Sequence, residues 1–481
     1  MKHTNTVSTA GKLGIFGLAG IVISSMIGGG IFSLPQNMAQ SASVGGVLLA
    51  WLITGLGIWF IANTFRLLAD LKPDLTSGIY MYARSGFGPY MGFNIGWSYW
   101  LCQICGNVGY AVITMDALNY FFPGVFAGGN NLASIIGGSL LIWGFNWLVL
   151  RGVKQATQIN LIATIAKIVP LILFCIIMIF VFHLDQFDSN FWGRLGHMKL
   201  GSVGDQVKNC MLVTLWSFIG IEGAVVLSGR AKSQKDVGCA TIMGFLGCLA
   251  IYVLLSVLPY GFMSQPELAQ IANPSTAGVL ARVVGPWGAW LMNVGLIVAV
   301  LSSWLSWTMI TAQMPQSMAQ NGTFPKCFAR ENEKGAPSVS LWMTSLLMQL
   351  AMLLVYFSNN AWNTMLSITG VMVLPAYLFS CLYLWKICDE EKISVASQWM
   401  AKITGILGSV YAIWLIYAAG LKYLLMAVVF IAMGLPVYVM AKRETVKTGC
   451  VFSKDEKALV ILILLVAAFA VYAFSRGLIK M

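Results

Sequence analysis

The sequence predicts an all-α integral membrane protein of twelve or thirteen transmembrane helices, arranged as two inverted five-helix repeats in which the first and sixth helices are interrupted. Hydrophobic residues make up 58% of the 481 residues and charged residues only 10%, whereas soluble domains carry roughly 25% charged residues. Apolar stretches of about 20 residues, the length that a bilayer requires, follow one another along the chain. Two of them contain glycine motifs that a continuous helix would not favour.

Charged or Gly/Pro-containing loops separate the apolar stretches. The predicted spans are 13–40, 46–68, 86–121, 131–150, 158–183, 207–229, 238–263, 281–319, 338–357, 362–386, 403–420, 422–441 and 457–476. The last span is an addition to a core of twelve. No stretch remains for a soluble domain, so residues 1–481 are predicted to form a single transmembrane domain. Its parts would be one repeat at about 13–183, a second repeat at about 207–386 and additional helices at about 403–476.

The net charge of +12 follows the predicted topology. Most Lys and Arg residues fall in the N-terminal tail and in the alternate loops on its side of the membrane. Because cytoplasmic loops carry an excess of positive charge, this bias predicts a cytoplasmic N-terminus. The basic composition therefore indicates a membrane-lipid environment and no nucleic-acid partner.

The first apolar stretch is interrupted within Ser25–Pro35. Gly28, Gly29 and Gly30 follow one another where a membrane helix would have to be continuous, and each glycine costs about 1 kcal/mol relative to alanine inside a helix. Unwound backbone inside a bilayer survives only where protein buries it or where it lines a wet cavity. A broken helix leaves free N–H groups at one half-helix end and free carbonyls at the other, so we expect half of a site for a small charged molecule.

A similar motif occurs in the sixth predicted span. Ser217-Phe218-Ile219-Gly220-Ile221-Glu222-Gly223 parallels Ser25-Met26-Ile27-Gly28-Gly29-Gly30. The two motifs lie five spans apart. Because five is an odd number, the sixth span crosses the membrane in the opposite direction to the first. Paired interruptions in two inverted halves are typical of transporters whose broken helices border one substrate site.

Two charged residues lie at membrane depth. Glu222 directly follows the second interruption, and a carboxylate in hydrocarbon is costly enough to indicate a function, as a proton sensor or a counter-charge to a cationic substrate. The alternative is a protonated structural carboxyl bonded to the freed backbone. Lys167 lies well inside the fifth span. Its ammonium either neutralises carbonyls at the first interruption, where a sodium ion would otherwise bind, or extends toward a wet vestibule.

Aromatic and amide side chains lie at a similar depth. Trp216 immediately precedes the second interruption, and Trp307 lies in the eighth span. Aromatic faces attract cations and can also close a cavity, although packing and interface positions remain the alternative in a chain with 17 Trp residues. The third span adds four polar residues, Tyr99, Gln103, Asn107 and Tyr110. The two amides would bond either a substrate or a neighbouring helix.

The sequence offers no machinery for catalysis. It contains no P-loop, no nucleophile motif and no cluster of metal-ligating side chains, so we predict no enzyme activity, no cofactor and no metal site. The Cys102-Gln103-Ile104-Cys105 motif lies inside a span and is interpreted as small apolar packing.

Several motifs resemble those of the amino acid–polyamine–organocation transporters. Met26-Ile27-Gly28-Gly29-Gly30-Ile31-Phe32 is similar to the first-helix interruption of that superfamily. Thr214-Leu215-Trp216-Ser217-Phe218-Ile219-Gly220-Ile221-Glu222 is similar to the sixth-helix motif of its basic amino acid/polyamine antiporter branch. Further similar stretches are Tyr99-Trp100-Leu101-Cys102, Gly106-Asn107, Gly322-Thr323-Phe324-Pro325 and Phe328-Ala329-Arg330-Glu331-Asn332. The resemblance covers about residues 13–443 and implies the LeuT-like fold in a bacterial inner membrane, with a homodimer as an open alternative to a monomer.

The resemblance implies gating roles for four of these residues. Trp216 would stack on the guanidinium-bearing chain of the substrate and act as a middle gate. Tyr99, Trp307 and Glu222 would form an inner gate, in which Glu222 senses protons.

Binding roles are implied for a second set of residues. The backbone of Ile27, Gly28, Gly29, Gly30 and Ile219 would hold the carboxylate and α-amino groups of the substrate. Asn107 and Trp307 would also contact the substrate. Ser367 or Thr369 would line the guanidinium end.

The chain departs from the family pattern at several positions. Gly29 stands where the most similar antiporters often have Ser, so carboxylate binding would depend on backbone N–H groups alone. Gln103 and Tyr110 stand where those antiporters have less polar residues. Lys167 aligns with a fifth-helix lysine of some proton-coupled relatives, which implies that it replaces a sodium ion.

The resemblance is strongest to bacterial arginine/agmatine antiporters and next to arginine/ornithine antiporters. It implies exchange of extracellular L-arginine for intracellular agmatine by alternating access, in support of acid resistance or arginine use. The alternatives are arginine/ornithine exchange, another amino acid/amine pair, or a proton-coupled amino acid importer. A receptor or channel would not require paired helix interruptions with a carboxylate between them.

Overall fold

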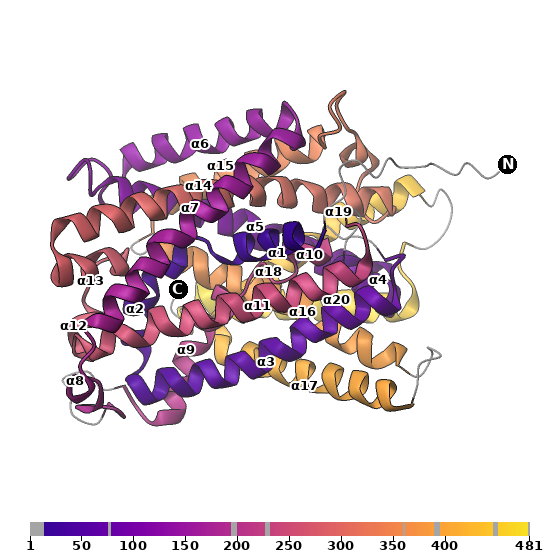
Figure 1. Ribbon diagram of the computed structural model, residues 1–481. Helices are drawn as coiled ribbons and strands as arrows, with labels where there is room; N and C mark the ends of the chain where they lie inside the picture. The colour runs from indigo at the N-terminus through magenta and orange to yellow at the C-terminus, as the bar shows by residue number, and fades with distance from the viewer. Residues whose placement is uncertain are drawn as a thin grey trace.

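The computed structural model describes residues 14–75, 78–193, 200–226, 231–358, 361–388, 395–445 and 451–479. Long helices run side by side, and short helices and turns connect their ends (Figure 1). Within the described residues, ten helices are long and apolar enough to cross a membrane, and the bent pair at the start of the chain brings the number to eleven. The chain is a multi-pass, helical membrane protein, which confirms the predicted fold class.

The helices fall into three groups. The long helices are α3 (Val44–Leu71), α5 (Pro89–Leu118), α6 (Leu132–Leu150), α7 (Val153–Phe180), α11 (Gln234–Val257), α14 (Pro286–Gln320), α15 (Ser338–Val355), α16 (Ala361–Ile387), α17 (Val395–Ala419) and α20 (Lys454–Ser475). The divided helices are α1 (Ile15–Met26) with η1 (Gly29–Ser33) and α2 (Leu34–Ser41), α9 (Val203–Ser217) with α10 (Gly223–Val226), and α18 (Leu421–Ala432) with α19 (Leu435–Thr445). The short connecting helices include α4 (Ile79–Phe87), α8 (Leu184–Asp188), α12 (Gln265–Ala269) and α13 (Ser275–Val284).

Eleven of the predicted spans coincide with the eleven candidate membrane helices. The other two, 158–183 and 207–229, coincide with α7 and with the α9–α10 pair. Neither has enough described helical residues to count as a membrane-crossing helix, and the reasons differ. The helix α9 has only 15 residues because it ends at the second interruption, and the described side chains of α7 begin at residue 166. Residues 13 and 227–229 of the predicted spans lie outside the described residues.

Helix starts follow local capping chemistry. The side chain of Ser202 accepts the backbone N–H of Asp205, and the Asp205 carboxylate accepts the Ser202 N–H in return. The same reciprocal arrangement joins Ser453 and Glu456 at the start of α20. Such a pair satisfies two N–H groups that the first turn would leave unpaired, and it explains why α9 and α20 begin where they do.

The centre of the bundle is formed by α1, α5, α11, α14 and α16. The helix α16 packs on α5, α5 packs on α14, and α1 packs on α11. Close packing of α1 on α11 depends on Gly244, where a Cβ atom would lie 2.5 Å from Cγ1 of Val22. Small residues commonly permit such approaches between membrane helices. The helix α1 also packs on α10, so the two interrupted helices meet, and Ile27 and Glu222 at the two interruptions are buried.

Candidate functional site

The first interruption is formed by Ile27 and Gly28. The helix α1 ends at Met26, the following Ile27 and Gly28 leave the helical conformation, and the chain resumes as the 3-10 turn η1 before α2. The segments before and after the break are bent by 49°. This arrangement confirms the predicted break. As a consequence, the N–H groups at the start of η1 have no preceding helical turn whose carbonyls could accept them.

The second interruption lies between Ser217, the last residue of α9, and Gly223, the first residue of α10. Gly220 has a φ angle of +112°, a conformation that residues with a side chain rarely adopt. A Cβ atom at Gly220 would also lie 2.8 Å from the carbonyl carbon of Ser25. Glycine at this position is therefore required twice, by the backbone conformation and by the close approach of the first interruption.

Side chains of α1 and α14 tie the two interruptions together. The Ser25 hydroxyl donates to the carbonyls of Gly220 (2.8 Å) and Val22 (2.9 Å). The indole N–H of Trp307 donates to the carbonyl of Ser25 at 3.2 Å. The Ser303 hydroxyl lies 3.1 Å and 3.2 Å from the carbonyls of Ser24 and Ile27. Carbonyls released at the end of α1 are thus satisfied by residues far away in the sequence.

Lys167 lies against the carbonyl end of the first interruption. Its Nζ donates to the carbonyl of Ser24 (2.8 Å), to the Ser24 hydroxyl (2.9 Å) and to the Ser303 hydroxyl (3.0 Å). The side chain is completely buried. This geometry rejects the alternative of a lysine that extends toward a wet vestibule and agrees with an ammonium that binds the freed carbonyls.

Glu222 is completely buried beside the second interruption. Its Oε1 accepts the Tyr99 hydroxyl at 2.6 Å, and its Oε2 accepts the Tyr377 hydroxyl at 2.8 Å and the Gly220 N–H at 3.1 Å. The predicted pairing of Tyr99 with Glu222 is therefore present. Tyr377 was not predicted, and nothing in its spacing along the sequence indicates this contact.

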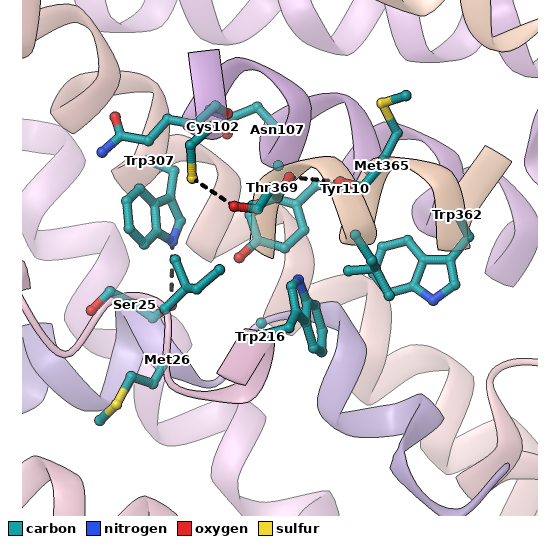
Figure 2. Close-up of a pocket in the computed structure, with 16 residues that line it drawn as sticks. Ser25, Met26, Cys102, Asn107, Tyr110, Trp216, Trp307, Trp362, Met365 and Thr369 are labelled. Atoms are coloured by element: carbon teal, nitrogen blue, oxygen red, sulfur yellow. Dashed lines mark hydrogen bonds between the residues drawn. The ribbon is translucent and has the colours of Figure 1, made fainter. Parts of the chain in front are cut away.

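A cavity lies between the two interruptions (Figure 2). Among the predicted site residues, those that line it are Gly28, Asn107, Trp216, Ile219, Trp307 and Thr369. Its other lining residues include Ser25, Cys102, Gln103, Tyr110, Trp362 and Met365. The wall is thus mainly aromatic and apolar, with a few polar groups, which is the usual composition of a small-molecule site.

The remaining predicted residues lie around this cavity. Ile27, Gly29 and Gly30 are buried in the first interruption but are not among its lining residues. Ser367 lines a neighbouring pocket, together with Asn37, Gln40, Ser41, Leu212, Val213, Trp216, Asn363 and Leu366. Of the two alternatives predicted in the tenth span, Thr369 lines the main cavity and Ser367 lines its neighbour.

Trp216 and Leu366 each line both pockets, so they lie at the boundary between the two. The indole ring of Trp216 lies directly over the first interruption, where a Cβ atom at Gly30 would overlap the ring at 1.1 Å from Cη2. On its other side the ring meets Trp362 edge-to-face, with centroids 5.6 Å apart and an interplanar angle of 83°. Trp362 was not predicted, since a Trp near the start of a span is more often an interface residue.

The amide groups of the cavity wall are only partly satisfied. The Nδ2 of Asn107 donates to the carbonyl of Gln103 (2.9 Å) and to the hydroxyl of Thr311 (3.1 Å). The Oδ1 of Asn107 and both amide atoms of Gln103 are buried and have no hydrogen-bond partner within the described part of the chain. The nitrogen of Asn107 therefore bonds the neighbouring helix α14, which is one of the two alternatives that the sequence left open.

Comparison with known proteins identifies the family of this chain. A sequence profile of the amino acid permease family matches residues 13–420. Arginine/agmatine antiporters of Chlamydia abortus and Chlamydia pneumoniae are each 60% identical to this chain, over 98% and 99% of its length and 99% and 100% of theirs. The arginine/agmatine antiporter of Chlamydia trachomatis serovar D is 57% identical over 97% of both chains. With its two interrupted helices and the cavity between them, the chain belongs to the amino acid permease family, whose members share the LeuT-like fold.

Proposed function

We propose that this protein exchanges extracellular L-arginine for intracellular agmatine by alternating access. The observation that carries the proposal is the cavity at the meeting point of the two interruptions. It has an aromatic wall and amide oxygens that have no hydrogen-bond partner among the residues that the structure describes. Aromatic faces attract cations, and amide oxygens accept the N–H groups of a guanidinium. Nearly full-length similarity to arginine/agmatine antiporters supports the same pair of substrates.

The two ends of the substrate would bind different parts of the cavity. N–H groups of the first interruption, around Ile27–Gly30, would bind the arginine carboxylate, because half-helix N-termini favour anions. The freed backbone around Ile219 would bind the α-amino group. Asn107 and Thr369 would accept hydrogen bonds from the guanidinium. Ser367, in the neighbouring pocket, would lie on the route of the substrate into the cavity.

Gating would involve four aromatic residues and one carboxylate. Trp216 lies at the boundary between the two pockets and would close over the substrate as a middle gate. Tyr99, Trp307 and Glu222 would form the inner gate, and Tyr377 completes the set because it shares Glu222 with Tyr99. Protonation of Glu222 would change what these two hydroxyls bond and so couple gating to pH.

Lys167 would take the place of a bound sodium ion. A cation at the carbonyl end of a broken helix offsets the negative end of its dipole. The hydrogen bonds of the Lys167 Nζ to Ser24 and Ser303 support this role. Transport would accordingly need no sodium gradient.

The exchange has a direct consequence for cellular charge. Agmatine lacks the carboxylate of arginine and therefore carries one more positive charge at neutral pH, so each cycle exports one net positive charge. Coupled to a decarboxylase that consumes a proton, the exchange would remove acid from the cell, in support of acid resistance or arginine use.

Topology and assembly complete the proposal. Excess positive charge on one side supports a cytoplasmic N-terminus in a bacterial inner membrane, which would place the pocket near the end of α2 on the extracellular side of Trp216. The domain would comprise two inverted repeats, at about 13–183 and 207–386, with further helices at about 403–476. Membrane lipid would surround it, and a homodimer remains an alternative to a monomer.

The decisive experiment is uptake of labelled arginine into liposomes that contain the purified protein. The liposomes are preloaded with agmatine, ornithine, cadaverine or nothing. Fast uptake against agmatine alone is the expected result. Fast uptake against ornithine alone would keep the site and the exchange but change the substrate pair. Uptake that does not depend on the internal load would contradict exchange and indicate a proton-driven importer.

A further inference from the structure

The three glycines of the first interruption have no room for side chains. A Cβ atom at Gly28 would lie 2.5 Å from the hydroxyl oxygen of Tyr110, and one at Gly30 would overlap the Trp216 ring. A Cβ atom at Gly29 would lie 2.9 Å from methyl carbons of both Ile113 and Val300. Real Cβ atoms essentially never come so close to other heavy atoms, so the break supplies no hydroxyl of its own. This includes Gly29.

Three hydroxyl groups line the cavity among the described residues, and two are already used as donors. The Ser25 hydroxyl donates to the carbonyls of Val22 and Gly220. The Thr369 hydroxyl donates to the carbonyl of Met365 at 2.7 Å. The third belongs to Tyr110, whose oxygen faces Gly28. Its oxygen also accepts the indole N–H of Trp307, and because an indole N–H only donates, that contact does not use the Tyr110 proton.

The ring of Tyr110 is well placed for a ligand contact. Figure 2 shows it near the centre of the lining residues, between Trp307 and Trp216, with its oxygen directed toward the side of Ser25. Gly106 and Gly109, on the same helix, also line the cavity. A ligand that reaches the N–H groups at the start of η1 would therefore also reach the Tyr110 hydroxyl.

We propose that Tyr110 is a specificity-determining residue that donates its hydroxyl hydrogen bond to the α-carboxylate of the amino acid substrate. The inference rests on the proposed function and deepens it. Backbone N–H groups of the first interruption would supply part of the carboxylate site, and Tyr110 supplies the O–H donor that Gly29 lacks. A phenol that donates to a carboxylate forms a charge-assisted hydrogen bond, which is stronger than a bond between neutral groups.

This role separates the two substrates. Arginine has a carboxylate and agmatine does not, so the Tyr110 bond stabilises only bound arginine. Removal of the hydroxyl should weaken arginine binding and leave agmatine binding unchanged. A Tyr110 that served only to pack the cavity wall would affect both substrates alike, because both share the same carbon chain and guanidinium.

The test compares wild-type protein with Tyr110→Phe in liposomes, with arginine and agmatine each measured as the external substrate against internal arginine. We expect the KM for arginine to rise roughly tenfold, the effect of losing one hydrogen bond to a charged group, and the KM for agmatine to stay at the wild-type value. An equal change for both substrates, or no change for arginine, would overturn the assignment.

Two controls keep the outcome interpretable. Tyr411→Phe removes a buried hydroxyl from α17, away from the cavity, and should leave both KM values unchanged. The melting temperature of Tyr110→Phe in detergent shows whether the variant is folded. Failure of the wild-type protein to exchange arginine for agmatine would refute the proposed function itself, an outcome distinct from an unselective effect of Tyr110→Phe.

Discussion

The hydroxyl of Ser25 donates a hydrogen bond to the carbonyl of Gly220, 2.8 Å away, and so joins the two interrupted helices directly. The residues are separated by 195 positions in the sequence. A Cβ atom at Gly223 would lie 2.9 Å from the same Ser25 oxygen. The second interruption therefore approaches Ser25 through Gly220 and Gly223, which lie before and after Glu222 in the sequence. Any movement of α1 relative to α9 and α10 must therefore break this hydrogen bond, unless Ser25 and Gly220 move together.

The Ser25→Ala variant tests that link. It removes a buried donor, while the Gly220 carbonyl keeps the hydrogen bond from the Gly223 N–H, so the free energy of unfolding should fall by about 0.5–1.5 kcal/mol. We expect a lower melting temperature in detergent and a slower exchange rate in liposomes. Ser409→Ala on α17, where the hydroxyl bonds only the preceding turn at Gly405, is the matched control and should change neither measurement appreciably.

A Gly30→Ala substitution should abolish exchange. The new methyl group would overlap the Trp216 ring, so either the ring or the backbone of the interruption must move, at a cost of roughly 1–3 kcal/mol for overpacking. Gly20→Ala, in α1, is a sharp control because a Cβ atom there meets no atom within 4 Å. Comparison of uptake and melting temperature for the two variants distinguishes the local clash with Trp216 from the general effect of replacing a glycine by alanine. Wild-type exchange by Gly30→Ala would contradict the position of Trp216.

Lys167 should make transport independent of sodium. Arginine uptake by the wild-type protein is expected to be equal in sodium and choline buffers. Lys167→Ala removes three hydrogen bonds and leaves buried oxygens unsatisfied at a cost of about 1–3 kcal/mol, so exchange should be lost. Lys235→Ala, an exposed lysine, should retain it. A sodium requirement in the wild-type protein would disprove the replacement of a sodium ion by Lys167.

Glu222→Gln should flatten the dependence of exchange on pH. Glutamine keeps the size of the side chain but cannot titrate. Its carbonyl oxygen can still accept the Tyr377 hydroxyl and the Gly220 N–H, while its amide NH2 donates to the Tyr99 oxygen. The measurement is the initial rate of arginine/agmatine exchange over a range of pH, identical on both sides of the liposome membrane. If the profile of the variant follows that of the wild-type protein, the proton sensor lies elsewhere.

Gln103→Leu should separate stability from function. Both amide atoms of Gln103 are buried and lack a hydrogen-bond partner among the described residues, so an apolar side chain of similar size removes a desolvation cost of about 1–3 kcal/mol. The melting temperature should rise. If the amide binds the guanidinium, the KM values for arginine and agmatine should rise together, in contrast to the selective effect of Tyr110→Phe. An unchanged KM would limit Gln103 to a structural role.

The sequence alone determined the features that depend on local composition. Spans follow from runs of apolar residues, and the interruption at Gly28 follows from three glycines in a row. Glu222 and Lys167 could be identified because a charge inside hydrocarbon is costly wherever its neighbours lie. Even the pairing of the two interruptions could be inferred, since a repeated motif in an inverted half needs no knowledge of packing.

Only the tertiary structure decided which side chains meet. Tyr377 reaches Glu222, Trp362 meets Trp216, and Tyr110 lies against Gly28 because α5 and α16 pack beside the interrupted helices. Such contacts depend on the rotation of each helix about its axis, and many similar Tyr and Trp residues compete for any assignment from sequence. Hydrogen bonds and close contacts within the folded bundle fix that rotation, so these partners of the site become visible only once the helices are packed.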